Sequence, residues 1–476
     1  MLSLEREERD ALWRELAEVI EEYIQSVSSH RVAPVVDVGA LRSKISEVDF
    51  SRPMEPRAAL RWVTELLWNA QVHTPHRRYY GLFNPNPTPM GIAADSLVAA
   101  FNPQLAAWGH SPAACEVEQY LIRSFGERFG YEVGKVAGSF ASGGAEANHT
   151  ALLCALVHAF PEYADGGARA LAGQPVLYVS GESHHSVAKA ARLCGIGTNA
   201  VVNVPLDGGF VMDCAALSRL IERDRRDGRL PFMVVATLGT TNAGLIDPVA
   251  RIAEVAAAER VWLHADAAWG GAAVLVPELR GHLVGIERAD SITFDAHKFL
   301  SVPMSAGMFF TRHAELPERV FSVRTDYMPL THGQPIVEPH RTSMQWSRRF
   351  IGLKLFMSLM VAGWEGYEVA IRHQTAMGEL LRKKLEAAEW RVVNRTPLPT
   401  VCFVDGRASV SGANALERLR AISDAIVAEG KAWISTTLMG GTTPVIRACI
   451  TNYETGPEDI AALVRDLDGA RAELDR

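Results

Sequence analysis

Short β-branched runs alternate with helical stretches from about residue 136 to residue 311, and this alternation is the strongest constraint on the fold. Helices are indicated between most of the runs, for example over 213–226 and 248–259. Such alternation predicts an α/β domain with a mostly parallel sheet, in which ligands bind beyond the carboxyl ends of the strands. The expected strands cover residues 175–179, 200–204, 233–237, 261–264, 291–294 and 307–310.

Helical patterns flank this region on both sides. An amphipathic helix is expected over about 5–28, and it packs either on its own domain or on a second subunit. Residues 345–389 are strongly helical, and the chain after them mixes short strands with helices. The expected parts are an N-terminal helical dimerisation segment (1–80), a large domain (81–350) and a smaller C-terminal α+β domain (351–476).

Composition excludes several classes of protein. The net charge of −7 over 476 residues, with both signs interspersed, argues against a nucleic-acid partner. The N-terminus is charged at once and no apolar run is long enough to span a membrane, so neither a signal peptide nor a membrane protein is expected. Six scattered cysteines without a Cys-x-x-Cys pair indicate reduced thiols in a cytoplasmic protein and no zinc or other metal site.

The stretch Asp295-Ala296-His297-Lys298 closes one expected strand and is followed by further apolar residues. Burial of a strand-end lysine favours its neutral amine, which is a nucleophile toward carbonyl groups. A lone lysine of this kind more often extends its ammonium group to water. The nucleophilic interpretation of Lys298 therefore depends on finding the rest of a site at other strand ends.

Two other strand ends offer a phosphate cradle and an acid. Ser142-Gly143-Gly144-Ala145 precedes a run of good helix formers, and the free amides of a helix N-terminus bind phosphate. An ordinary loop-to-helix junction is the alternative. Asp266 ends a hydrophobic strand, where its carboxylate needs a partner such as a protonated pyridine nitrogen. Its alternative roles are a helix N-cap or a structural ion pair.

Polar segments follow two further strands. His184 or His185 could stack on an aromatic cofactor, or only cap a helix. The hydroxyls and glycines of the segment 236–244 could bind a phenolic oxygen or only form a turn. Each element is weak alone, but together they lie at successive strand ends of one sheet. This set fits pyridoxal 5'-phosphate (PLP), with Lys298 forming a Schiff base and Asp266 keeping the ring nitrogen protonated.

The motifs Ser-Gly-Gly-Ala-Glu-Ala-Asn, Thr-Leu-Gly-Thr-Thr, His-Ala-Asp-Ala-Ala-Trp-Gly-Gly and Asp-Ala-His-Lys-Phe-Leu together resemble those of the group II PLP-dependent amino-acid decarboxylases. That family includes aromatic-L-amino-acid, histidine and glutamate decarboxylases. The resemblance runs from Trp68 to about Ile460. It implies a fold type I (aspartate aminotransferase-like) homodimer whose N-terminal segment packs on the partner chain.

The resemblance also assigns cofactor-binding residues. Lys298 matches the Schiff-base lysine, His184 the stacking histidine and Asp266 the partner of the ring nitrogen. Ala145 stands where the family usually has Ser or Thr, so backbone amides must replace a hydroxyl contact to the phosphate. Asp295 is often Asn in animal members, and an acid near a phosphate is unfavourable unless it is turned away or solvated. The full set is Ser142, Gly144, Ala145, His184, Thr241, Asp266, Ala268, His297 and Lys298.

Further matches concern the substrate. Tyr327, in a segment that resembles the mobile catalytic loop of the family, aligns with the tyrosine that protonates the substrate carbon, although the pattern alone indicates only a surface turn. Arg447 lies inside an apolar strand and needs a carboxylate, either that of the substrate or one in an internal ion pair. Phe83, Trp108 and His110 match pocket positions, and an aromatic lining suits an aromatic side chain.

The expected function is the PLP-dependent decarboxylation of an L-amino acid, preferably an aromatic one, with Lys298, His184, Tyr327 and Asp266 as catalytic residues. Glutamate or another amino acid is an alternative substrate. An aminotransferase or another lyase is an alternative enzyme, because Arg447 could hold a carboxylate in either reaction. A non-enzymatic fold type I scaffold is a third alternative, against which the intact Lys298 and Asp266 count.

Overall fold

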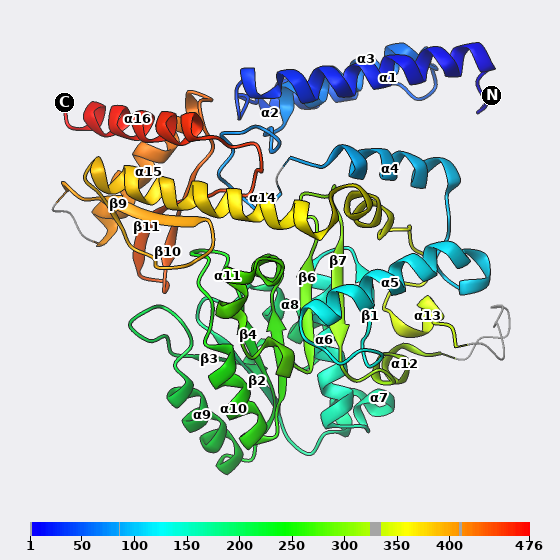
Figure 1. Cartoon of the computed structure of the whole chain (residues 1–476), viewed down its shortest axis with the longest axis vertical. Coiled ribbons are helices and arrows are strands. Elements are labelled where there is room, and N and C mark those ends of the chain that lie inside the picture. The colour runs from blue at the N-terminus through cyan, green and yellow to red at the C-terminus, as the bar shows by residue number, and fades with distance from the viewer. Residues whose placement is uncertain (1, 85, 324–334, 409–411) are drawn as a thin grey trace.

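A mixed β-sheet forms the centre of the larger part of the molecule (Figure 1). The computed structural model describes residues 2–84, 86–323, 335–408 and 412–476. The strands of this sheet are β1 Ala137–Ala141, β2 Pro175–Ser180, β3 Val201–Val204, β4 Leu230–Thr237, β5 Trp262–Asp266, β6 Ser291–Asp295 and β7 Gly307–Thr311. Their order is β1-β7-β6-β5-β4-β2-β3. Strand β7 runs antiparallel to β6 and β1, and the other neighbouring strands run parallel.

Strands β2 to β7 lie where the sequence pattern predicts them, with ends that differ by up to three residues. Strand β1 was not among the expected strands, because its sequence Ala-Gly-Ser-Phe-Ala has no β-branched residue. Its pairing with β7 requires a small residue at Gly138, where a Cβ atom would lie 2.1 Å from the carbonyl oxygen of Phe309. Tertiary pairing therefore supplies what local propensity lacks.

Helices cover both faces of the sheet and bury two separate apolar cores. One core includes residues of α6 (Gly144–Ala159), α8 (Ser186–Leu193) and α12 (Leu316–Phe321). The other includes residues of α5 (Pro112–Arg128), α9 (Cys214–Arg226), α10 (Val249–Glu259) and the start of α14. Shorter helices connect these layers: α7 Tyr163–Gly166, α11 Pro277–Arg280 and α13 Pro339–Thr342.

The C-terminal part has its own antiparallel sheet of order β10-β11-β9-β8 and its own core. Tyr80, which is fully buried, packs into this core from the N-terminal side of the chain. The elements are α14 Leu353–Ala387, β8 Trp390–Val392, β9 Thr400–Asp405, α15 Gly412–Ala428, β10 Ser435–Met439, β11 Thr443–Cys449 and α16 Pro457–Leu474.

Helix α14 begins later than the helix expected over 345–389 and is interrupted at Gly363, whose φ is 62°. The reason lies in Glu118 of α5. Its buried carboxylate pairs with Arg348 and accepts hydrogen bonds from the amides of Ile351 and Gly352. These contacts hold the residues before Leu353 in a non-helical path.

The N-terminal helices α1 (Arg6–Ser26), α2 (Val38–Ser46) and α3 (Pro56–Ala70) lie along one edge of the molecule (Figure 1). None of their residues is buried, and apolar side chains such as Trp13 and Leu67 are exposed. After the proline-rich loop, α4 (Pro89–Phe101) packs against α14. None of the described helices combines the length and the apolar composition that a membrane span needs.

Candidate active site

The carboxyl ends of β1, β2, β4, β5 and β6 meet in one pocket. Seven of its lining residues belong to the set predicted from the sequence, and they come from five separate strand ends. The geometry therefore brings together the cradle, the histidine, the threonine turn, the aspartate and the lysine. The pocket is lined by Gly144, Ala145, Asn148, His184, Thr237, Gly239, Thr241, Asp266, Ala268, Trp269, Asp295 and Lys298.

Lys298 forms an ion pair with a buried carboxylate at the end of β6. Its Nζ lies 2.9 Å from Oδ2 of Asp295, whose side chain is 2% exposed, while that of Lys298 is 24% exposed. The sequence predicted apolar surroundings that favour a neutral amine, and this was incomplete because it left out the neighbouring acid. The other oxygen of Asp295, Oδ1, has no hydrogen-bond partner among the described residues.

Gly144 brings the start of helix α6 close to Asp295. A Cβ atom at position 144 would lie 2.8 Å from Oδ2 of Asp295, so a larger residue would displace that carboxylate. The first amides of an α-helix have no partner within the helix, which makes this a suitable phosphate cradle. Ser142 lies at the edge of the cradle, where its hydroxyl and its amide both donate to the carboxylate of Glu146.

Asp266 is buried at the end of β5, and each of its oxygens accepts one hydrogen bond from a neutral donor. The side-chain amide of Asn148 donates to Oδ2 at 2.9 Å, and the backbone amide of Ala268 donates to Oδ1 at 3.2 Å. Among the described residues Asp266 has no cation within ion-pair distance. A buried carboxylate with only neutral partners remains suited to a cationic ligand.

Two histidines lie near Lys298 in the chain or in the pocket, and burial lowers the pKa of each. Desolvation by the pocket wall lowers the pKa of His184, although part of the ring is exposed. Its Nδ1 accepts a hydrogen bond from the amide of Ser186 at 3.2 Å. Desolvation likewise lowers the pKa of His297, whose Nδ1 accepts from the amide of Ala306 at 2.9 Å. His297 is therefore held toward β7 and is not among the residues that line the pocket.

An aromatic pair and an arginine lie beside the pocket. The ring of Phe83 stacks on that of Trp269 with centroids 4.4 Å apart, and Nζ of Lys298 lies 5.9 Å from the Phe83 centroid. The guanidinium carbon of Arg447 lies 5.0 Å from the same centroid. Arg447 donates to the carbonyl oxygens of Thr241 and Gly81, whereas its Nη2 has no partner among the described residues.

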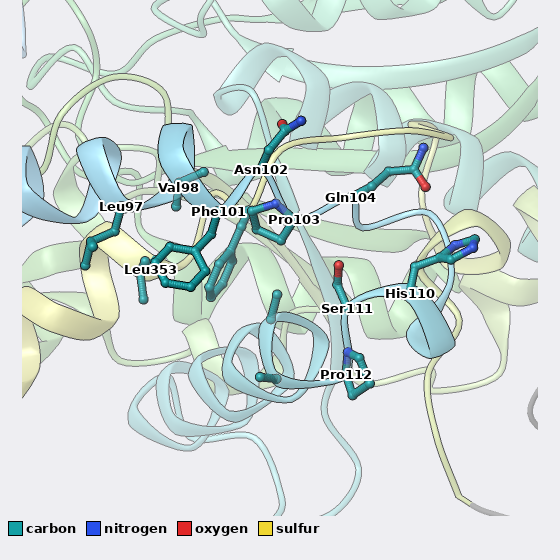
Figure 2. A pocket seen from close by; sticks show the side chains of 13 residues that line it. Leu97, Val98, Phe101, Asn102, Pro103, Gln104, His110, Ser111, Pro112 and Leu353 are labelled. Atoms are coloured by element: carbon teal, nitrogen blue, oxygen red, sulfur yellow. The ribbon is translucent and has the colours of Figure 1, made fainter. Parts of the chain in front are cut away.

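Trp108 and His110 do not line the pocket that holds Lys298. The Trp108 amide donates to Glu338, and its indole donates to Glu116. Figure 2 shows His110 at one side of a separate groove, with Leu97 and Phe101 of α4 at the opposite side. The predicted substrate role of Trp108 and His110 is thus not explained by their place in a single chain.

Tyr327 lies outside the described residues. Asn148 was missed, because it stands in the glycine-rich motif but reaches Asp266 across the interior from helix α6. Its position on the first turns of that helix, facing the sheet, was the signal that could have found it.

The chemical groups that line the pocket fit PLP. The start of α6 offers amides for a phosphate, Asp266 offers a buried carboxylate for a protonated ring nitrogen, and Lys298 offers an amine for an aldehyde. A parallel sheet with these three groups at its strand ends defines the fold type I PLP-dependent enzymes, and this chain is one of them.

Comparison with known proteins gives the family. Residues 51–405 match the model of the pyridoxal-dependent decarboxylase conserved domain. The aromatic-L-amino-acid decarboxylase of Bacillus atrophaeus is 28% identical over 99% of this chain and 97% of its own length. The L-2,4-diaminobutyrate decarboxylase of Rhizobium meliloti is 34% identical, over 59% of this chain and 55% of its own length.

Solved structures of other proteins have the same fold as this chain. The crystal structure of Oryza sativa TDC with PLP and tryptamine superposes with a TM-score of 0.93 at 24% identity, covering 100% of this chain and 99% of that chain. Mouse CSAD gives 0.92 at 23% identity, over 98% and 99%. The chain belongs to the pyridoxal-dependent decarboxylase family, and it is a PLP-dependent amino-acid decarboxylase.

Proposed function

We propose that this decarboxylase converts an aromatic L-amino acid to its amine and CO2, with the cofactor held on Lys298. The observation that carries the choice of substrate is the stacked pair Phe83–Trp269 beside Lys298. Both rings are buried, and an aromatic side chain that reached the edge of this pair would gain favourable aromatic contacts. When bound, PLP withdraws electrons from the bonds at the substrate's α-carbon, which lets the carboxylate leave as CO2.

Lys298 and Asp295 act together in cofactor capture. An amine attacks a carbonyl only in its neutral form, so Lys298 must first give up a proton. Oδ2 of Asp295, 2.9 Å from Nζ, accepts that proton. Asp266, held by Asn148 and by the amide of Ala268, stabilises the positive charge on the ring nitrogen. His184, which lines the pocket after β2, would pack against the ring.

Arg447 binds a carboxylate of the substrate in this proposal. Its two hydrogen-bonded nitrogens contact neutral carbonyl oxygens, and its third nitrogen has no partner, so its buried charge has no anionic partner among the described residues. A buried guanidinium binds carboxylates strongly. The same cation, close to Phe83, opposes the second ammonium group of 2,4-diaminobutyrate, which is the substrate in the name of one relative.

A panel of the twenty amino acids and 2,4-diaminobutyrate tests the substrate. CO2 and amine are measured for each at equal concentration. We expect phenylalanine, tyrosine, tryptophan or their hydroxylated forms to react fastest. Fast turnover of glutamate alone would assign Arg447 to a side-chain carboxylate and would overturn the aromatic proposal, as would a preference for diaminobutyrate. Formation of pyridoxamine phosphate without CO2 would instead indicate an aminotransferase.

Tyr327 is proposed to give the proton that the α-carbon takes after CO2 leaves. The Tyr327→Phe variant then retains bound PLP, seen by its visible absorption, but loses most amine formation. Amine output equal to that of the wild type would remove Tyr327 from the mechanism.

The active form is proposed to be a homodimer. Helices α1 and α3 have no buried residue, and their exposed apolar side chains need a covering surface. Trp108 and His110 lie away from the Lys298 pocket of their own chain, so they would serve the substrate through a second copy. Sedimentation or light scattering tests this, and a monomer with full activity would contradict it.

A further inference from the structure

A buried chain of hydrogen bonds leads from the interior of the sheet to Asp266. The indole Nε1 of Trp262 donates to Oγ of Ser291 at 2.9 Å, and that oxygen lies 2.8 Å from Nδ1 of His264. Nε2 of His264 lies 3.0 Å from Oδ1 of Asn148, whose amide nitrogen donates to Asp266 at 2.9 Å. All five residues are buried.

Strand periodicity brings these groups onto one face. Side chains two residues apart point to the same side of a strand, so Trp262, His264 and Asp266 of β5 share a face. Ser291 of β6 pairs with His264 in register, and α6 covers the same strands with Asn148. The chain is therefore built into the fold and does not depend on a loop conformation.

The chemistry of the partners fixes the direction of every bond. Asp266 is an acceptor only, so Asn148 turns its NH2 group toward it and its oxygen toward His264. Nε2 of His264 must then carry the proton, and Nδ1 accepts from the hydroxyl of Ser291. Burial lowers the pKa of His264 to about 4, which keeps this single neutral tautomer at pH 7.

The same amide reaches the other side of the cofactor pocket. Nδ2 of Asn148 also donates to Oγ of Ser186 at 2.9 Å. The backbone amide of Ser186 in turn donates to Nδ1 of His184. One side chain thus contacts both Asp266 and the turn that holds His184.

Given the role proposed for Asp266, we propose that Asn148 is a positioning residue that fixes Asp266 and the His184 turn on either side of the cofactor ring, and that His264 keeps its amide in the required orientation. If the amide flipped, its oxygen would face Oδ2 of Asp266 at 2.9 Å, which is repulsive. His264 is not among the residues that line the pocket. We therefore expect it to affect cofactor affinity only through Asn148.

The test is a double-mutant cycle on the full-length enzyme, stripped of cofactor and titrated with PLP. The measured quantities are the dissociation constant and the visible circular dichroism of the bound cofactor. Asn148→Leu is expected to weaken PLP binding on the order of tenfold to a hundredfold, the usual effect of losing one hydrogen bond to a charged group. It is also expected to change the dichroism, which reports ring orientation.

His264→Phe is expected to weaken binding as well, because Asn148 is then free to flip. His264→Gln, which can still donate to Asn148, should restore most of the affinity. The double variant should bind PLP no more weakly than the weaker-binding of the two single variants, because both substitutions remove the same positioning function. Additive losses, or equal affinities of the Phe and Gln variants, would overturn the positioning role.

Two controls separate the possible failures. Asn452→Leu removes another buried asparagine, which donates to the carbonyl of Pro75, and it should leave PLP affinity unchanged. Asp266→Asn should weaken binding and abolish the charge on the ring nitrogen. Wild-type behaviour of Asp266→Asn would refute the proposed role of Asp266 itself. If Asp266→Asn binds PLP more weakly but Asn148→Leu binds it as tightly as the wild type does, only the role of Asn148 is refuted.

Discussion

The two ends of the active-site pocket differ in how completely their charged groups are partnered. At the Asp266 end both oxygens of Asp266 accept a hydrogen bond, and one of the two donors, Asn148, is itself held by the buried His264. At the Arg447 end a buried guanidinium donates only to carbonyl oxygens, and its Nη2 has no partner within the described chain. Asp266 is thus partnered by the protein alone, whereas Arg447 keeps a donor without a partner among the described residues. In the proposed function these two regions are the cofactor end and the substrate end, and a substrate carboxylate completes the latter.

Under the roles proposed for Asp266 and Arg447, affinity for PLP and affinity for the amino acid depend on separate parts of the fold. The cofactor end uses strands β5 and β6 and helix α6 of the large sheet. The substrate end uses Arg447 on β11 of the small sheet together with Phe83. Variants at one end should therefore change one affinity and leave the other nearly constant.

Lys298→Ala should have the largest effect, because Lys298 lies between the two ends and serves both. We expect decarboxylation to fall by roughly a thousandfold or more, as when other covalent catalytic groups are removed. The visible absorption of the bound cofactor should also be lost. A variant that kept both properties would show that another amine holds PLP.

Arg447→Leu should impair the substrate end and leave the cofactor end unchanged. The expected result is a loss in kcat/KM of roughly tenfold to a hundredfold, the range for losing hydrogen bonds between charged groups, with PLP affinity unchanged. Arg447→Lys tests whether charge alone suffices and should recover only part of the loss, since its ammonium lacks the planar fork. A large loss of PLP affinity in Arg447→Leu would show that the two ends do not act independently.

Asp295→Asn should sharpen the description of the cofactor end. In the proposed function Lys298 would hold the cofactor, so Asp295 would lose its cation while lying beside Gly144, where the phosphate cradle begins. Like charges at short range repel, so the neutral amide should tighten PLP binding severalfold at equilibrium, while capture becomes slower without a proton acceptor. Stopped-flow mixing with PLP measures the rate, and a titration measures the affinity. Weaker binding at equilibrium would mean that the Asp295 charge does not oppose the phosphate.

Acid should lower the free energy of unfolding through His264, and this effect should be smallest near neutral pH. The pKa of His264 is about 4 in the folded protein and near 6.5 when unfolded, so the unfolded chain binds more protons between these values. Its contribution is fully present above pH 6.5 and is lost as pH falls toward 4, by up to roughly 3 kcal/mol. Urea unfolding at pH 7, 6 and 5 measures this slope, and His264→Gln should reduce it, while buried histidines such as His76 keep the remainder. An equal slope in that variant would assign the acid sensitivity to other groups.

Much of the pocket could be predicted from the sequence because its residues follow strand ends. Lys298, Asp266 and Gly144 each stand beside an apolar run or a helix start, and those local signals give their position in an α/β sheet. The contact of Asn148 with His264 joins residues 116 positions apart, and no local pattern contains it. The late start of α14 has a similar cause, because Glu118 acts across 230 positions through Arg348.

Strand β7 has a consequence for how firmly Lys298 is held. Because β7 is antiparallel to β6, the chain returns beside its own strand, and Lys298 lies in a connection whose two ends are fixed in neighbouring strands inside the sheet. The amide of Ala296 extends that pairing by donating to the carbonyl of Ala306. The other pocket residues follow strands that lead into helices, so their turns can open without unpairing the sheet. Hydrogen exchange around Lys298 should accordingly require global unfolding, and the lysine should be the slowest part of the pocket to open.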